Sequence, residues 1–135
     1  MLSATKTIGT LGELAVAQDL IRRGWDVYTA IGDCTKIDIV AIKEHVIKRH
    51  QIKSVQFSLD GVVCVEAAKT ISGKRVPYHP DDFDYLTLYV VDRNRIAYIP
   101  LSVIYGRSLT LRFTPTKNGQ VKNVQSFDNF TELAQ

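Results

Sequence analysis

Two consecutive extended runs of the sequence, residues 36–42 and residues 50–56, carry polar side chains at set positions within an apolar framework. The first run contains Asp38, and the second contains Gln51 and Lys53. Side chains two residues apart on a strand share a face, so Gln51 and Lys53 point in the same direction. If the two runs pair as a hairpin, Asp38 can meet them across the sheet. The spacing therefore predicts a sheet that gathers a carboxylate, an amide and an ammonium group at one end.

These three groups have a shared chemistry. Carboxylate and amide oxygens can bind a hard divalent cation such as Mg²⁺, and an ammonium group can bind a phosphate. Together they indicate a nuclease. A carboxylate in an apolar strand costs free energy unless it is paired or metal-bound. The alternative explanation is therefore a structural salt bridge between Asp38 and Lys53.

A helix is expected before these strands. Thr10 is a suitable N-cap, and Glu13 three residues later completes a Thr-x-x-Glu capping box. Gly24 suits the left-handed residue that ends the helix. Apolar side chains recur between them at helical spacing, at Leu11, Leu14, Ala15 and Ile21. Glu13 has two explanations, as part of the cap or as a member of the site, and the sequence leaves both open.

The remainder of the chain is dominated by short β-branched and aromatic runs that predict strands. These runs lie at residues 25–28, 62–65, 85–91, 96–99 and 109–113. One helix followed by strands predicts a mixed-sheet α/β domain. No low-complexity linker or internal repeat divides the chain, so residues 1–135 are expected to form a single domain.

Composition indicates which binding partners the protein can have and in which cellular compartment it is expected. The 135 residues carry a net charge of +3, which permits a polyanionic partner without requiring one. No apolar run approaches the roughly 18 residues that a membrane helix needs, so we expect no membrane association. Cys34 and Cys64 stand far apart without metal-binding spacing. Free thiols of a reducing cytoplasm are the expected state.

The arrangement of Glu13, Asp38 and the tripeptide Gln51-Ile-Lys53 resembles the signature of the PD-(D/E)XK nucleases. That signature is an acid at the end of one strand and an acid-x-Lys tripeptide on the next, often joined by a glutamate on the preceding helix. The phrase that begins Gly12-Glu-Leu-Ala and ends at Gly24-Trp looks like archaeal Holliday junction resolvases. It looks even more like small homing endonucleases encoded in cyanobacterial group I introns. The resemblance implies a restriction-endonuclease-like core, with a mixed β-sheet flanked by helices.

Two positions depart from the family pattern. Ile37 stands where a proline is expected before the first acid, which is a mild variation. Gln51 stands where the tripeptide has an acid. An amide oxygen can bind Mg²⁺ but brings no charge to offset the ion. Because active members of the intron-encoded group tolerate glutamine here, the resemblance implies an active enzyme; the alternative is a catalytically inactive DNA-binding protein.

The resemblance further implies a Mg²⁺- or Mn²⁺-dependent endonuclease that acts on double-stranded DNA. Asp38, Gln51 and the backbone carbonyl of Ile52 are the expected metal ligands, with Glu13 a candidate for a second ion. Lys53 is expected to orient the attacking water or to balance negative charge. One such site cuts one strand, so cutting both strands requires at least a symmetric dimer. The intron-encoded group implies a homotetramer; the rival activity is Holliday junction resolution, which reads branched shape instead of sequence.

Basic side chains indicate where DNA would be contacted. A hairpin is expected at about residues 61–76, and it carries Lys69, Lys74 and Arg75. A two-stranded ribbon fits the major groove, where arginine and lysine can read guanine edges. Arg93 and Arg95 in a later turn are further candidates. A protein that recognises a DNA sequence needs an element that inserts into the groove. This hairpin is therefore the feature that distinguishes a homing endonuclease from a resolvase.

Overall fold

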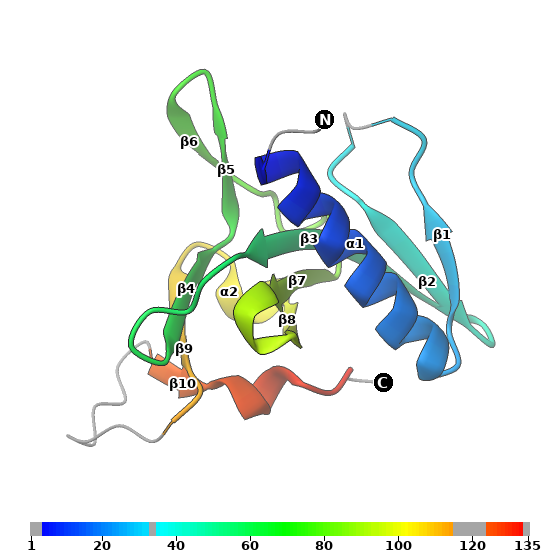
Figure 1. The fold of residues 1–135 in the computed structure, drawn as a ribbon. Coiled ribbons are helices and arrows are strands. Elements are labelled where there is room, and N and C mark those ends of the chain that lie inside the picture. Colours follow the sequence, from blue (N-terminus) through cyan, green and yellow to red (C-terminus); the bar gives the residue numbers. More distant parts are fainter. Residues whose placement is uncertain (1–3, 33–34, 115–123, 134–135) are drawn as a thin grey trace.

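A mixed five-stranded sheet forms the centre of the protein (Figure 1). The computed structural model describes residues 4–32, 35–114 and 124–133. β3 and β7 run parallel, and every other neighbouring pair in this sheet is antiparallel. In sheet order the strands are β1 (Asp26–Thr29), β2 (Ile39–Lys43), β3 (Val46–Val55), β7 (Tyr85–Val90) and β8 (Arg95–Pro100). The predicted mixed-sheet α/β class is confirmed.

The predicted hairpin of the two polar-bearing runs is formed by β2 and β3. Ile39 lies opposite His50, and Lys43 lies opposite Val46. The turn between them consists of Glu44 and His45, so most of residues 43–49 is strand. The first strand begins at Ile39 rather than at residue 36. Asp38 therefore lies immediately before β2, at the end of the sheet.

α1 (Ala4–Arg22) crosses one face of this sheet (Figure 1). The predicted helix start at Thr10 was wrong, and so was the capping box with Glu13. Thr10 lies inside the helix, where its hydroxyl donates a 3.0 Å hydrogen bond to the carbonyl oxygen of Lys6. A threonine inside a helix commonly satisfies its hydroxyl in this way, so a suitable cap residue does not by itself locate the first turn. Gly24, at a φ of 91°, follows the end of the helix as predicted.

The face of α1 that packs on the sheet carries Gly12, Val16 and Leu20, each four residues from the next. The apolar residues that defined the helix in the sequence mostly face away: Leu14 is 62% exposed and Ile21 is 60% exposed. A Cβ atom placed on Gly12 would lie 1.8 Å from the hydroxyl oxygen of Ser54 on β3. The helix therefore lies so close to the sheet that a side chain at this position would require the Ser54 hydroxyl to turn away.

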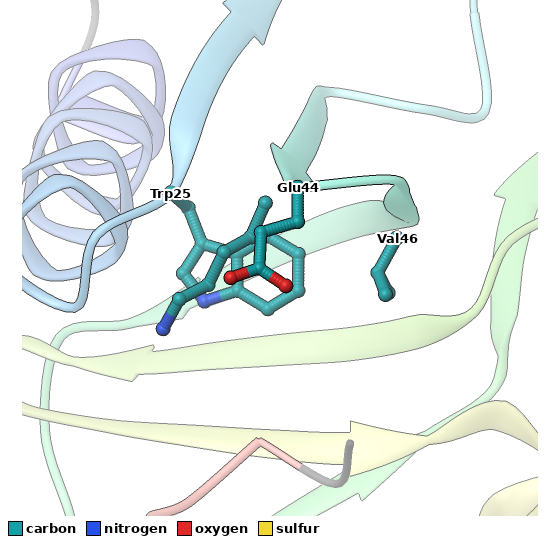
Figure 2. A pocket seen from close by; sticks show the side chains of 4 residues that line it. Trp25, Glu44 and Val46 are labelled. Atoms are coloured by element: carbon teal, nitrogen blue, oxygen red, sulfur yellow. The ribbon is translucent and has the colours of Figure 1, made fainter.

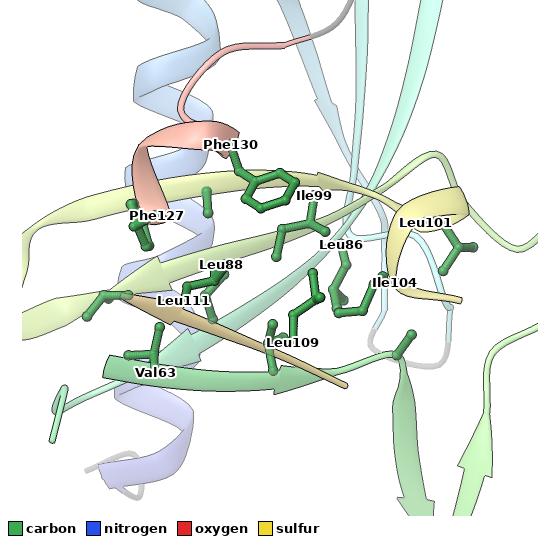
Figure 3. Close-up of a cluster of buried hydrophobic side chains, with 14 of the residues drawn as sticks. Val63, Leu86, Leu88, Ile99, Leu101, Ile104, Leu109, Leu111, Phe127 and Phe130 are labelled. Atoms are coloured by element: carbon green, nitrogen blue, oxygen red, sulfur yellow. The ribbon is translucent and has the colours of Figure 1, made fainter. Parts of the chain in front are cut away.

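A second, smaller sheet covers the opposite face of the central sheet. It consists of β10 (Val124–Ser126), β9 (Ser108–Arg112) and β4 (Val62–Glu66) in that order. Three short helices follow strands of the two sheets: α2 (Leu101–Ile104), η1 (Val91–Arg93) and η2 (Phe127–Phe130). Apolar side chains fill the space between the two sheets (Figure 3), among them Val63, Leu86, Leu88, Ile99, Leu101, Ile104, Leu109, Leu111, Phe127 and Phe130.

β5 (Ala68–Ile71) and β6 (Lys74–Pro77) form a two-stranded ribbon that projects from the body of the protein (Figure 1). Its turn residues, Ser72 and Gly73, have φ values of 51° and 78°. Positive φ at both central residues is what a type I′ hairpin turn requires. The predicted limits of this hairpin, residues 61–76, were too wide. β4 pairs with β9 instead, because its alternate residues belong to the core between the sheets.

None of the helices in the described ranges has the length and apolar character needed to cross a membrane. Cys64 is a free, exposed thiol, and Cys34 lies outside the described residues.

Candidate active site

The structure brings Asp38 and Gln51 into direct contact at the end of the β2–β3 hairpin. The side-chain amide of Gln51 donates to Oδ2 of Asp38 at 2.8 Å. The backbone N–H of Ile52 donates to the same oxygen, also at 2.8 Å. The backbone N–H of Asp38 donates to the carbonyl oxygen of His50 at 2.8 Å. Side chain and backbone are thus both anchored to β3.

Two side-chain oxygen atoms remain free at this contact. Within the described residues, Oδ1 of Asp38 and Oε1 of Gln51 accept no hydrogen bond. The side-chain amide of Gln51 also donates to the carbonyl oxygen of Ile52 at 3.4 Å, and this carbonyl keeps a second lone pair. Carboxylate, amide and backbone carbonyl oxygens are the donors that hard divalent cations bind. The residues present therefore suit such an ion.

Negative charge at this cluster comes chiefly from Asp38. Burial raises the pKa of Asp38 above its ordinary value; the hydrogen bond from Ile52 opposes this, and the charge of Glu13 adds to the rise. Glu13 is exposed on α1, yet it is close enough for its charge to act on Asp38. In the described part of the chain, no three acidic, histidine or cysteine side chains come together as a metal site.

Lys53 turns toward the base of the projecting ribbon. Its ammonium group donates to the carbonyl oxygen of Glu66 at 3.0 Å and to that of Ala68 at 2.6 Å. Burial lowers its pKa, and the charge of Glu66 partly offsets this. An ammonium group has three donors, so one proton remains. No ion pair joins Lys53 to Asp38 within the described ranges, and the alternative of a structural salt bridge receives no support.

Two aromatic residues near the site were not anticipated from the sequence. The Tyr78 ring lies with its centroid 5.8 Å from the ammonium nitrogen of Lys53. Tyr85 stacks on the buried ring of His50, with ring centroids 5.2 Å apart. His50 in turn bonds to the hydroxyl of Thr87 at 2.7 Å. Nothing in the local sequence marks these residues, because each reaches the site through strand pairing or chain reversal.

The predicted DNA-contacting cations fall into two groups. Lys69, Lys74 and Arg75 lie on the β5–β6 ribbon, and Arg75 forms a 2.9 Å ion pair with Glu66. Arg93 and Arg95 lie elsewhere, around the turn that joins β7 to β8. Their guanidinium groups lie over aromatic rings: Arg93 is 4.5 Å from the centroid of Phe113, and Arg95 is 4.8 Å from that of Phe127. Arg95 also pairs with Asp128.

The pocket drawn in Figure 2 lies at the far end of the β2–β3 hairpin from Asp38. Its volume is about 170 Å³, and it is lined by Trp25, Lys43, Glu44 and Val46. It contains none of the predicted site residues. A shallower hollow of about 230 Å³ borders Asp38 and is lined mainly by residues of β1 and of the segment before β2. The candidate site is thus an open surface at the end of the sheet.

A helix crosses the mixed sheet, which has the acid Asp38 immediately before one strand and the tripeptide Gln51-Ile-Lys53 on the next. This arrangement is that of a nuclease. Residues 3–133 match the family model of the PD-(D/E)XK endonucleases, and the chain belongs to this family of phosphodiester hydrolases. Among solved structures, it is similar to the bacterial homing endonuclease I-Ssp6803I, with 25% sequence identity and a TM-score of 0.76. That match covers 90% of this chain and 86% of the other. A search of curated proteins returned no significant match. The resemblance inferred from the sequence is confirmed.

Proposed function

We propose that this protein is a site-specific homing endonuclease that requires Mg²⁺ or Mn²⁺ and cuts both strands of a long double-stranded DNA target. The observation that carries the proposal is the Asp38–Gln51 contact, with Lys53 two residues further along the same strand. It occurs on a chain that belongs to an endonuclease family and shares its fold with a homing endonuclease.

The oxygen set fits a divalent ion, and PD-(D/E)XK nucleases typically use one. Asp38, Gln51 and the carbonyl of Ile52 would hold it, with Glu13 the candidate ligand for a second ion. When bound, the ion supplies Lewis-acid polarisation of the scissile phosphate. The two hydrogen bonds to Oδ2 of Asp38 keep this carboxylate in one orientation. Lys53 either orients the attacking water or offsets the negative charge that develops on the phosphate.

The β5–β6 ribbon supports recognition of sequence. It projects from the body of the protein, and Lys74 and Arg75 are exposed near its turn. A ribbon of this kind fits the major groove, where arginine can read guanine. Lys69, Arg93 and Arg95 are the other proposed DNA contacts. A junction resolvase has no need of such an insertion, and the ribbon therefore favours the homing endonuclease.

One active site cuts one strand, so we propose an assembly of at least a symmetric dimer, with a tetramer favoured. A small domain that must span a long target gains reach in this way. The mass of the assembly, measured by sedimentation with and without DNA, tests this part of the proposal. A monomer that remains a monomer on its target would contradict it.

The activity is tested with a library of long duplex DNA incubated with Mg²⁺, with Mn²⁺ or with EDTA. We expect cutting of both strands at one recurrent sequence, dependent on the ion. Four-way junctions of unrelated sequence serve as the comparison substrate. Cutting of junctions alone would identify a resolvase. Binding of duplex DNA without cutting in either ion would identify an inactive DNA-binding protein, for which Gln51 was the sequence evidence.

A further inference from the structure

Tyr78 is held rigidly at the base of the projecting ribbon. It follows β6 directly, and its backbone N–H donates to the carbonyl oxygen of Ala67 at 3.1 Å. Its side chain is 5% exposed. The ring packs edge-on against Phe83, with centroids 4.9 Å apart and an interplanar angle of 75°. Backbone and ring contacts together leave the hydroxyl in one place.

The Tyr78 ring lies beside Lys53, one of the residues of the candidate active site. The ring is 5.8 Å from the ammonium nitrogen of Lys53. Burial raises the pKa of the Tyr78 hydroxyl, and the charges of Asp38 and Asp82 raise it further. Asp38 is therefore near enough to influence the hydroxyl electrostatically. At neutral pH the group is protonated and can donate a hydrogen bond.

The Tyr78 hydroxyl differs from those of two other buried tyrosines. Tyr98 donates to Asp19, and Tyr89 donates to Asn94 at 2.8 Å. Among the hydrogen bonds of the described residues, none involves the Tyr78 hydroxyl, and this atom is not one of the buried polar atoms left without a partner. The hydroxyl therefore reaches the protein surface. A fixed, protonated donor at the surface, on a ring beside the Lys53 ammonium group, is suited to a ligand that brings acceptor oxygens.

We propose that Tyr78 is a further catalytic residue of this endonuclease, and that its hydroxyl donates a hydrogen bond to a non-bridging oxygen of the scissile phosphate. The inference rests on the proposed active site at Asp38, Gln51 and Lys53. A neutral donor complements Lys53, because it stabilises negative charge on the phosphate without repelling a nearby cation. A preorganised donor of this kind acts most strongly where charge develops in the transition state.

Tyr78→Phe tests the proposal, because it removes the hydroxyl and keeps the ring beside Lys53 and Phe83. With the DNA target recovered from the duplex library, we expect single-turnover cleavage to slow by about 10- to 100-fold. The melting temperature and the affinity for DNA in Ca²⁺ should stay close to those of the unaltered protein. Tyr105→Phe, which removes the hydroxyl of an exposed tyrosine, is the matched control and should cut at the normal rate.

Two comparisons separate this role from a structural one. If only the ring mattered, Tyr78→Phe would cut normally while Tyr78→Leu would not, and that result would overturn the inference. Loss of a contact with the phosphate should lower the plateau rate of cleavage at saturating Mg²⁺. A variant whose plateau is normal and whose Mg²⁺ midpoint alone has moved would also overturn it.

Asp38→Asn is assayed in parallel, so that failure of the inference can be told from failure of the proposed site. Loss of cutting in Asp38→Asn with normal cutting in Tyr78→Phe refutes the role of Tyr78 alone. Normal cutting in Asp38→Asn refutes the proposed site, and the role assigned to Tyr78 falls with it.

Discussion

Gln51 donates its side-chain amide to the carboxylate of Asp38 at 2.8 Å, from the position where the family motif has an acid. A second carboxylate there would repel Asp38 in the metal-free protein. The amide instead holds Asp38 in place and leaves its own oxygen available. Glutamine therefore fixes the orientation of the Asp38 carboxylate without adding a second charge.

Gln51→Glu should tighten Mg²⁺ binding, because it adds a charge with little change in length. Without metal it should be less stable than the unaltered protein, since two carboxylates then lie side by side. Thermal unfolding in EDTA and in Mg²⁺ measures this, and the gain from Mg²⁺ should be larger in the variant. Cleavage rate against Mg²⁺ concentration, with Gln51→Ala as the second variant, gives the metal requirement. Identical curves for all three proteins would show that Gln51 is no ligand.

Asp38→Asn and Lys53→Met should stay folded and bind DNA but cut it slower by orders of magnitude, as expected for groups that act on the transition state. Methionine keeps an apolar stem in place of the lysine, although the carbonyl oxygens of Glu66 and Ala68 lose their donor. DNA binding in Ca²⁺ and circular dichroism verify that both variants are intact. Near-normal cutting by either would remove that residue from the mechanism.

Lys74 and Arg75 should contribute to DNA binding through the ribbon. If Lys74 meets a phosphate, Lys74→Ala should weaken binding to all sequences alike and reduce the salt slope by about 0.9. If Arg75 reads a base, Arg75→Ala should relax specificity at one position, by about 1–3 kcal/mol. Binding isotherms at several salt concentrations, on the target and on scrambled DNA, distinguish the two. A double variant with unchanged affinity and slope would place the interface elsewhere.

Gly12→Ala should destabilise the protein by about 1–3 kcal/mol, because the new Cβ overlaps the Ser54 hydroxyl, which must turn away, and lies 3.2 Å from the Ser54 Cβ. Glu13 is the next residue of the helix, so a shift of α1 should lower cleavage as well. Gly9→Ala is the matched control: it adds a Cβ in the same helix with nothing within 4 Å, and alanine there should stabilise by about 0.5–1 kcal/mol. Urea unfolding measures both, and partial rescue of Gly12→Ala by Ser54→Ala would locate the clash.

Stability should fall as the pH drops through the range set by His50. Burial lowers the pKa of His50 to about 4; Asp84 opposes this, and Lys48 adds to it. The unfolded histidine has a pKa of about 6.5, so the unfolded state takes up a proton first. The stabilising contribution is complete above about pH 6.5 and is lost as the pH falls toward 4.

Urea unfolding of the unaltered protein and of His50→Phe, each between pH 4 and 8 in EDTA, tests this dependence. Phenylalanine keeps a ring against Tyr85 and removes the titrating group, although Thr87 loses its partner. The variant should show a flatter pH dependence over this interval. Parallel curves for the two proteins would assign the acid sensitivity to other groups.

Several features followed from the sequence alone. The alternation of apolar and polar residues in a strand is a local property with a period of two, and it predicted a hairpin that brings Asp38 to Gln51; the paired residues are 39–43 and 46–50. The strand at 85–90 was predicted from its β-branched and aromatic residues. Side-chain types and their spacing also sufficed for the family, since a catalytic motif is defined by chemistry at fixed intervals.

The tertiary structure decided what depends on segments far apart in the chain. The face of α1 that packs on the sheet carries Gly12, Val16 and Leu20, whereas Leu14 and Ile21 are exposed. β4 is not part of the predicted hairpin, because it pairs with β9 and its side chains pack in the core between the two sheets. Tyr78 reached Lys53 only because the chain reverses at the ribbon. Local patterns predict elements, whereas contacts between distant elements decide which faces are buried and which polar groups meet.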